Sequence, residues 1–218
     1  MGAILWGFES PLRHFNMNKG KAAIFLSGRG SNFEAIYQSS QHPGANFEIA
    51  VVISDKKDAP GLEKAKEYGL PAHLVLPKLF NSKEEYEKHL VNLLREMDVD
   101  LVCLAGYMRI VGEELLKAFE NRIMNIHPAL LPSFPGLHAQ KQAFDYGVKI
   151  SGCTVHFIDS GVDTGPIILQ QPVEVLEDDN EETLSNRILA VEHKIYSQAI
   201  RLFFENRLKL RERRVIIS

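Results

Sequence analysis

The feature that most constrains the fold of this chain is a regular alternation of short apolar runs with segments of helical spacing. The apolar runs predict strands at residues 22–27, 47–55, 72–76, 100–106, 122–127, 150–159 and 166–175. Segments with an apolar stripe of helical period predict helices at 31–40, 61–69, 82–97, 139–146 and about 181–206. This alternation predicts an α/β fold with an open, mostly parallel sheet and right-handed crossovers that place helices on both faces.

Two of the predicted strands also indicate where they lie in the sheet. The run at 100–106 is apolar on both faces, which is typical of a central parallel strand. Pro172 interrupts the run at 166–175, and because proline cannot donate to a ladder, this strand is expected at an edge. Ligands in such folds gather outside the carboxyl ends of the strands.

Composition excludes several classes of protein. The net charge of −3 and the sequence pI of about 6.2 argue against a nucleic-acid protein with a broad basic surface. No apolar run approaches the roughly 20 residues that span a bilayer, so we expect no membrane partner. Cys103 and Cys153 lie inside strand-like runs and are expected to be buried free thiols.

The chain begins with an apolar opening that Glu9, Pro11 and Arg13 interrupt. It has neither a basic n-region nor a small-residue cleavage site, so it does not resemble a signal peptide. We expect residues 1–20 to be a disordered extension, residues 21–218 to form a single domain, and the protein to be cytoplasmic.

A glycine-rich turn follows the first predicted strand, in "SGRGSNFEAI" at 27–36. Ser31 and Glu34 have the spacing of a capping box, and the free amides of a helix start next to glycine suit an anion. We therefore expect a single phosphate at Gly30, Ser31 and Asn32. A dinucleotide is disfavoured because Phe33 stands where the third fingerprint glycine would be, whereas a tight turn without a ligand remains an alternative.

An amide and an imidazole end the strand at 122–127, followed by the proline-rich "PALLPSFPG". Asn125 and His127 are two residues apart, so both side chains leave the same face of the sheet. Asn125 can donate to an oxyanion and His127 can transfer a proton near neutral pH. A carboxylate of the glycine-rich "IDSGVDTGP", Asp159 or Asp163, is expected to orient His127. The alternative is that these side chains only hold the loop backbone. Cysteine, histidine and acidic residues show no metal-ligand spacing, so we expect no metal.

Six motifs in order, "SGRGSN", "LAGYMRI", "NIHPALLPSFPGLHA", "SGCTVHFID", "GVDTGPIILQ" and "VEHKIY", resemble the folate-dependent phosphoribosylglycinamide formyltransferases over residues 21–210. The resemblance implies a Rossmann-like formyltransferase domain. It also implies that a formyl group passes from 10-formyltetrahydrofolate, the co-substrate, to the amine of glycinamide ribonucleotide in purine synthesis.

Matched position by position, the resemblance implies roles for individual residues. The catalytic residues would be Asn125, His127 and Asp163, and Glu192 would contact the ribonucleotide, although a solvated position on a helix face is its plain alternative. The folate site would include Lys83, Met108, Arg109, Ile110, Val111, Asn125 and Asp159. Lys83 stands where the family often has arginine. His156 is expected to be either a satisfied core histidine or a helper in catalysis.

Related activities remain as alternatives. A formyltetrahydrofolate hydrolase would use water as the acceptor but carries an N-terminal regulatory domain, for which about 20 residues are too few. A methionyl-tRNA formyltransferase would need a C-terminal module longer than "LKLRERRVIIS". Sugar-nucleotide formyltransferases and a non-catalytic folate- or phosphate-binding protein also stay open, as does the choice between a monomer and a homodimer.

Overall fold

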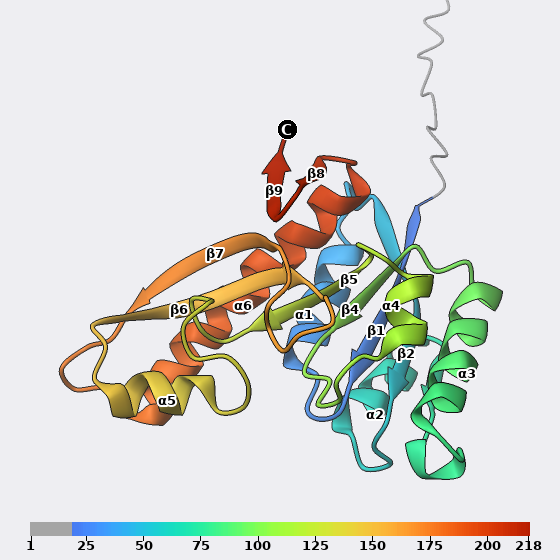
Figure 1. Cartoon of the computed structure of the whole chain (residues 1–218), viewed down its shortest axis with the longest axis horizontal. Helices are drawn as coiled ribbons and strands as arrows, with labels where there is room; N and C mark the ends of the chain where they lie inside the picture. Colours follow the sequence, from blue (N-terminus) through green and yellow to red (C-terminus); the bar gives the residue numbers. More distant parts are fainter. Residues whose placement is uncertain (1–18) are drawn as a thin grey trace, which may run out of the picture.

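The computed structural model describes residues 19–218, and the first strand begins at Gly20. Nearly all of the extension expected over residues 1–20 therefore lies outside the described residues. Figure 1 shows the described chain as a central sheet with helices packed around it.

Seven strands form this sheet in the order β3-β2-β1-β4-β5-β6-β7. Their bounds are β1 Gly20–Leu26, β2 Phe47–Ser54, β3 Ala72–Leu74, β4 Leu101–Leu104, β5 Ile123–His127, β6 Ile150–Phe157 and β7 Ile167–Glu174. Strands β1 to β5 run parallel to one another, whereas β6 runs antiparallel to β5 and β7 antiparallel to β6. The predicted open, mostly parallel α/β sheet is confirmed, and β7, which contains Pro172, lies at its edge as expected.

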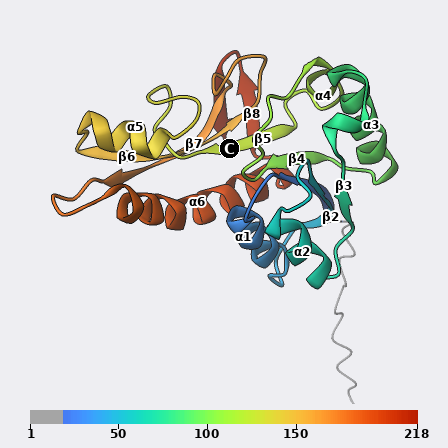
Figure 2. The same cartoon turned by 90° about the horizontal axis from the view of Figure 1, so that it is seen from below.

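Helices cover both faces of the sheet, as predicted (Figure 2). On one face lie α1 (Ser31–Ser40), α2 (Pro60–Glu67) and α6 (Glu181–Phe204), and on the other α3 (Lys83–Glu96) and α4 (Glu113–Ala118). The apolar side chains of the sheet alternate between these two helical layers, which gives two separate buried cores. Helix α5 (Ala139–Tyr146) lies beside α6. The short α4 and the 3-10 turn η1 (Pro77–Leu79) were not predicted.

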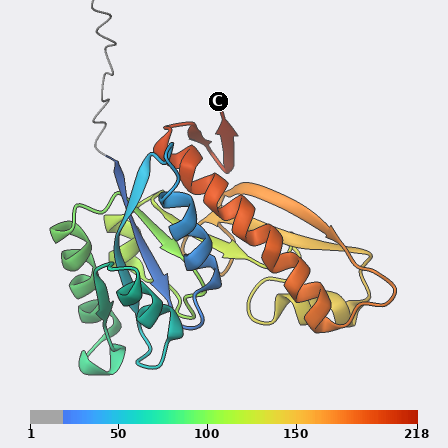
Figure 3. The same ribbon diagram turned by 180° about the vertical axis from the view of Figure 1, so that it is seen from behind.

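The long helix α6 crosses the back of the sheet (Figure 3). It starts at a capping box formed by Asn180 and Thr183, in which each side chain accepts a hydrogen bond from the other residue's backbone amide. Further along, the fully buried Tyr196 directs its hydroxyl at the carbonyl oxygens of Leu104, at 3.1 Å, and Met124, at 2.9 Å. This contact holds α6 across β4 and β5, directly behind the residues predicted for the site.

The last elements of the chain were not predicted. Strands β8 (Leu208–Arg211) and β9 (Arg214–Ile217) form a hairpin that lies against β7. At its tip, the guanidinium of Arg213 donates to the carbonyl of Thr164, next to Asp163. Within residues 19–218, no helix combines the length and the apolar character that crossing a bilayer requires.

Candidate active site

The site is centred on β5, which continues past the end of its neighbour β4. Leu104, the last residue of β4, pairs with Asn125, so His127 lies beyond the end of β4 on the same strand face as Asn125. Met124 and Ile126 point to the other face and belong to the core beneath α6. Because successive side chains of a strand point to opposite faces, Asn125 and His127 lie on the face away from this core.

The imidazole of His127 is held from both sides. Its Nδ1 lies 3.3 Å from Oδ2 of Asp163, and its Nε2 donates to the carbonyl oxygen of Phe134 at 2.8 Å. The residue is 4% exposed, so these two contacts determine the orientation of the ring. His127 can exchange a proton with a ligand only after one of the two contacts is replaced.

Asp163 links the two loops that cover this face of β5. Its backbone has φ 53°, in the left-handed region, and its carboxylate Oδ2 accepts from the amide of Gly136 at 2.8 Å. Gly136 belongs to the proline-rich loop after β5, whereas Asp163 belongs to the loop between β6 and β7. The structure thus brings Asp163 to His127 from a different part of the chain.

A second histidine, His156, completes the group. It pairs with Asn125 across β5 and β6, and Asn125 Nδ2 donates to His156 Nε2 at 3.3 Å. His156 Nδ1 in turn donates to the carbonyl of Phe157 at 2.9 Å. Burial lowers the pKa of His156, against the opposing effects of Phe157 and Asp163, which favours the neutral ring that this arrangement needs. His156 is a satisfied buried histidine, and it also orients the amide of Asn125.

The proline-rich loop is fastened to the sheet. The hydroxyl of Thr154 accepts from the amide of Leu131 at 3.0 Å and donates to the carbonyl of Ala129 at 2.7 Å. Gln170 adds a bond from its Nε2 to the carbonyl of Leu131 at 2.8 Å. Side chains from β6 and β7 therefore hold the loop that carries Phe134 and Gly136.

The glycine turn after β1 differs from the prediction at its cap. Helix α1 is preceded by Gly30 with φ 77°, and no side chain caps it, so the capping box expected from Ser31 and Glu34 is wrong. Glu34 pairs instead with Lys64 of α2. A Cβ at Gly30 would lie 2.9 Å from the Cα of Gly61, so this turn needs glycine both for its φ and for the close approach of α2. The first amides of α1 remain uncapped by side chains and can receive an anion.

Beside this turn, α1 and α6 share a buried polar pair. Asn32 Nδ2 donates to Oε2 of Glu192 at 2.8 Å, with Asn32 9% and Glu192 5% exposed. Burial raises the pKa of Glu192, and the bond from Asn32 opposes this shift. The interpretation of Glu192 as a solvated helix-face charge is therefore wrong. Among the described residues, Oδ1 of Asn32 is buried without a hydrogen-bond partner, which is an acceptor left for a ligand.

The residues predicted for folate lie in two places. In the loop after β4, Met108, Arg109 and Ile110 are exposed and Val111 is buried, and Lys83 reaches the end of the same loop from α3. Asp159, by contrast, accepts from the amide of Gly161 at 3.0 Å and from the hydroxyl of Thr164 at 2.6 Å.

Asp159 therefore organises its own loop. That loop is the one that carries Asp163.

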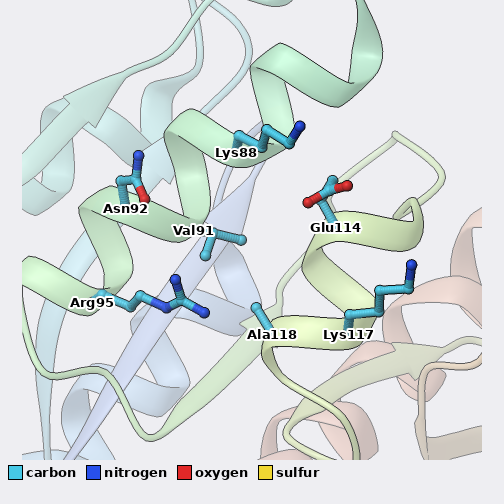
Figure 4. A pocket seen from close by; sticks show the side chains of 7 residues that line it. All are labelled: Lys88, Val91, Asn92, Arg95, Glu114, Lys117 and Ala118. Carbon is cyan, nitrogen blue, oxygen red and sulfur yellow. The ribbon is translucent and has the colours of Figure 1, made fainter.

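A hollow elsewhere on the molecule lies between α3 and α4 (Figure 4). Seven residues line it: Lys88, Val91, Asn92, Arg95, Glu114, Lys117 and Ala118. Lys88 is paired with Glu84 and Lys117 with Glu113, so most of its positive charge is already matched. The part of the chain from residue 19 onward contains no group of three or more His, Cys, Asp or Glu side chains placed to hold a metal ion.

Comparison with known proteins identifies the family of the chain. A family model described as formyl transferase matches residues 20–200. A phosphoribosylglycinamide formyltransferase of Bacillus subtilis (strain 168) is 44% identical over 181 residues, which cover 83% of this chain and 93% of the relative. The crystal structure of glycinamide ribonucleotide transformylase 1 from Symbiobacterium toebii superposes with a TM-score of 0.89 at 51% identity, covering 91% of this chain and 94% of that one.

A longer relative is the trifunctional purine biosynthetic protein adenosine-3 of Homo sapiens, which is 41% identical over 205 residues. The match covers 93% of this chain but 20% of the human protein, so the chain spans about a fifth of the length of that relative. The Bacillus subtilis relative is matched over nearly its whole length, and the family model covers most of this chain. The chain therefore belongs to the formyl transferase family.

Proposed function

We propose that the chain transfers the formyl group of 10-formyltetrahydrofolate to the amine of glycinamide ribonucleotide in de novo purine synthesis. The observation that carries the proposal is the contact between His127 and Asp163, 3.3 Å apart, beside Asn125, in a member of the formyl transferase family. The relatives named for this activity support the choice of acceptor. In this proposal, residues 21–218 act as one formyltransferase domain.

The chemistry is a direct transfer. The ribonucleotide amine attacks the formyl carbon, a C–N bond forms, and the carbonyl oxygen becomes an oxyanion that the amide of Asn125 stabilises. A proton leaves the attacking nitrogen and one reaches the folate nitrogen as its bond to the formyl carbon breaks. We assign this transfer to His127, oriented by Asp163. An oxyanion donor contributes roughly 10²–10³-fold and a positioned acid or base roughly 10²–10⁴-fold.

The contacts of His127 indicate which ring nitrogen faces the ligands. Nδ1 is turned to the carboxylate of Asp163, so Nε2 is the nitrogen that we assign to the reaction. Nε2 donates to the carbonyl of Phe134 at 2.8 Å, and the reaction requires a ligand or water to replace that carbonyl. The proposed reaction thus includes a small displacement of the proline-rich loop.

The ribonucleotide would be held at the glycine turn. Its phosphate would accept from the amide of Gly30, which precedes α1, and from the amides of Ser31 and Asn32, the first two residues of the helix, which no side chain caps. A sugar hydroxyl would donate to the carboxylate of Glu192. Strands β1 and β5 are separated by β4 alone, so with strands about 4.8 Å apart the turn and His127 are about 10 Å apart across the sheet.

The folate would lie along the loop after β4. Met108, Arg109, Ile110 and Val111 would contact the pterin and its surroundings, and Lys83 would pair with a carboxylate of its tail.

Asn125 and Asp159 would contact the folate from the opposite side of the site. We further propose that the enzyme needs no metal, acts on small molecules without nucleic acid or membrane partners, is cytoplasmic, and is a monomer or homodimer.

The test is an assay of tetrahydrofolate formation, with glycinamide ribonucleotide present and then omitted. Turnover that depends on the amine supports the proposal. Equal turnover in its absence would establish water as the acceptor and refute it. Binding of both ligands without formyl transfer would instead indicate a non-catalytic binding protein.

A further inference from the structure

The loop Tyr107–Gly112, which carries the proposed folate contacts, is fastened at its beginning to the glycine turn. The amide of Met108 donates to the hydroxyl of Ser27 at 2.9 Å, and that hydroxyl donates to Oδ1 of Asp55 at 2.6 Å. Asp55 is 4% exposed, so this carboxylate is a buried anchor. Asp55 directly follows β2, where a dinucleotide-binding protein would carry its ribose acid, and here it holds the hydroxyl of Ser27, which accepts from the backbone of Met108.

The end of the loop is fastened by a second buried carboxylate, Glu87 of α3. Glu87 is 3% exposed, and its Oε1 accepts from the amide of Gly112 at 2.6 Å. Lys83, one turn earlier on α3, places its ammonium 3.9 Å from the same oxygen. A charge-assisted hydrogen bond to a buried carboxylate is among the stronger bonds available to a loop.

Gly112 allows this contact because it has no side chain. Its φ of −105° and ψ of −172° are open to any residue, so the backbone does not require glycine. A Cβ at this position, however, would lie 2.6 Å from both carboxylate oxygens of Glu87 and 2.7 Å from Cε of Lys83. Glycine is therefore needed here because the carboxylate comes so close.

Between the two anchors, side chains support part of the loop: the guanidinium of Arg109 lies 5.6 Å from the centre of the Tyr86 ring, and Val111 is buried in the core beneath α3. Met108 is 64% and Ile110 65% exposed. In the described part of the chain, no hydrogen bond engages the backbone of Arg109 or Ile110. The backbone amide and carbonyl groups of Arg109 and Ile110 are consequently available to a ligand, and the two bonds at Met108 and Gly112 are the hydrogen bonds that hold the backbone on either side of them.

We propose that Glu87 is a positioning residue for the folate site, and this inference rests on the proposed function. Glu87 acts through two neighbours: it fixes the end of the loop through the amide of Gly112, and it holds the ammonium of Lys83 beside the loop. It touches neither the reacting atoms nor the ribonucleotide turn, so its loss should weaken folate binding selectively. A purely structural role would instead lower stability and leave the ratio of the two substrate KM values unchanged.

Four variants test this. Glu87→Ala removes the acceptor, and we expect KM for 10-formyltetrahydrofolate to rise about tenfold, or about 1.4 kcal/mol, just below what a hydrogen bond to a charged group contributes. KM for the ribonucleotide and kcat should stay within about twofold of wild type. Glu87→Gln keeps an oxygen for the Gly112 amide and should recover most of the affinity. Glu84→Ala, an exposed change on the same helix, is the matched control and should behave as wild type.

The fourth variant, Gly112→Ala, keeps the charge of Glu87 but displaces it, and it should raise the folate KM as Glu87→Ala does. It also provides the test if Glu87→Ala does not fold. Unchanged folate KM in Gly112→Ala, or equal increases in both KM values, would overturn the inference. Calorimetric binding of tetrahydrofolate, which needs no turnover, separates the two proposals. Wild type that binds tetrahydrofolate but transfers no formyl group would refute the proposed function, while a selective loss of binding in the variants would still support the role of Glu87.

Discussion

Replacement of Asp163 tests the central contact of the candidate site. Asparagine and alanine should separate the structural role of Asp163, its bond from the amide of Gly136, from the role of its charge beside His127. Asp163→Asn keeps the shape of the side chain and an oxygen that can accept from the amide of Gly136. Asparagine also tolerates the left-handed φ of 53° at this position. The nitrogen of the new amide takes the place of Oδ1, which lies 3.6 Å from Nε2 of His156. The variant should therefore fold within about 1 kcal/mol of wild type.

Asp163→Ala should behave differently. It removes the acceptor of a 2.8 Å bond from Gly136, which costs about 1.5–3 kcal/mol for a bond to a charged group. Alanine in the left-handed region costs about a further 1–2 kcal/mol. The expected loss of unfolding free energy is about 2.5–5 kcal/mol, a large part of the stability of an ordinary domain.

Both variants should lose activity because both lack the charge that faces His127. We expect kcat to fall at least about 10²-fold in Asp163→Asn, the lower end of what a positioned acid or base contributes. Urea unfolding and steady-state formyl transfer on the same preparations measure the two effects. If the activity of Asp163→Asn stays within about threefold of wild type, the negative charge of Asp163 is not needed for catalysis. Equal stability of the two variants would refute the anchoring role.

Three further outcomes are expected. Because burial raises the pKa of Glu192, its stabilising contribution is complete below pH 4.5 and is lost as pH rises through the raised pKa. Glu192→Gln should thus have a higher Tm than wild type at pH 7, a difference that vanishes towards pH 4, while KM for the ribonucleotide rises; a pH-independent Tm difference would contradict this. His127→Ala should lower kcat at least about 10²-fold, and near-normal turnover would exclude the residue from catalysis. Burial raises the pKa of Cys103 and that of Cys153, the latter to about 12, so native protein at pH 8 should not react with a thiol reagent until urea unfolds it, and rapid labelling would contradict their burial.

Much of the architecture could be predicted because it depends on local pattern. The apolar run at 100–106 indicated a central strand, and β4 lies between β1 and β5. Pro172 indicated an edge strand, and β7 is one. The short helix α4 was missed because its six residues follow a loop and show less than two turns of periodicity. The hairpin of β8 and β9 was missed because its strands are short and mostly exposed.

The candidate site was predictable only in part. The spacing of Asn125 and His127 indicated a shared strand face, and resemblance indicated Asp163. Nothing in the sequence showed that β6 runs antiparallel to β5, and that pairing is what places His156 against Asn125. The capping box predicted from Ser31 and Glu34 did not form because Glu34 pairs with Lys64 of α2. The local sequence does not indicate a contact between two separate helices.

By itself, the sequence determined most of the strands and helices, which strand is central, and the family to which the chain belongs. These follow from periodicity and residue type, which are properties of short segments. Only the tertiary structure decided that two carboxylates distant in sequence, Asp55 and Glu87, hold the two ends of one loop, and that Glu192 is buried against Asn32. Burial and long-range pairing depend on how the segments pack, and the same acidic residue is a solvated charge or a buried anchor according to what lies beside it.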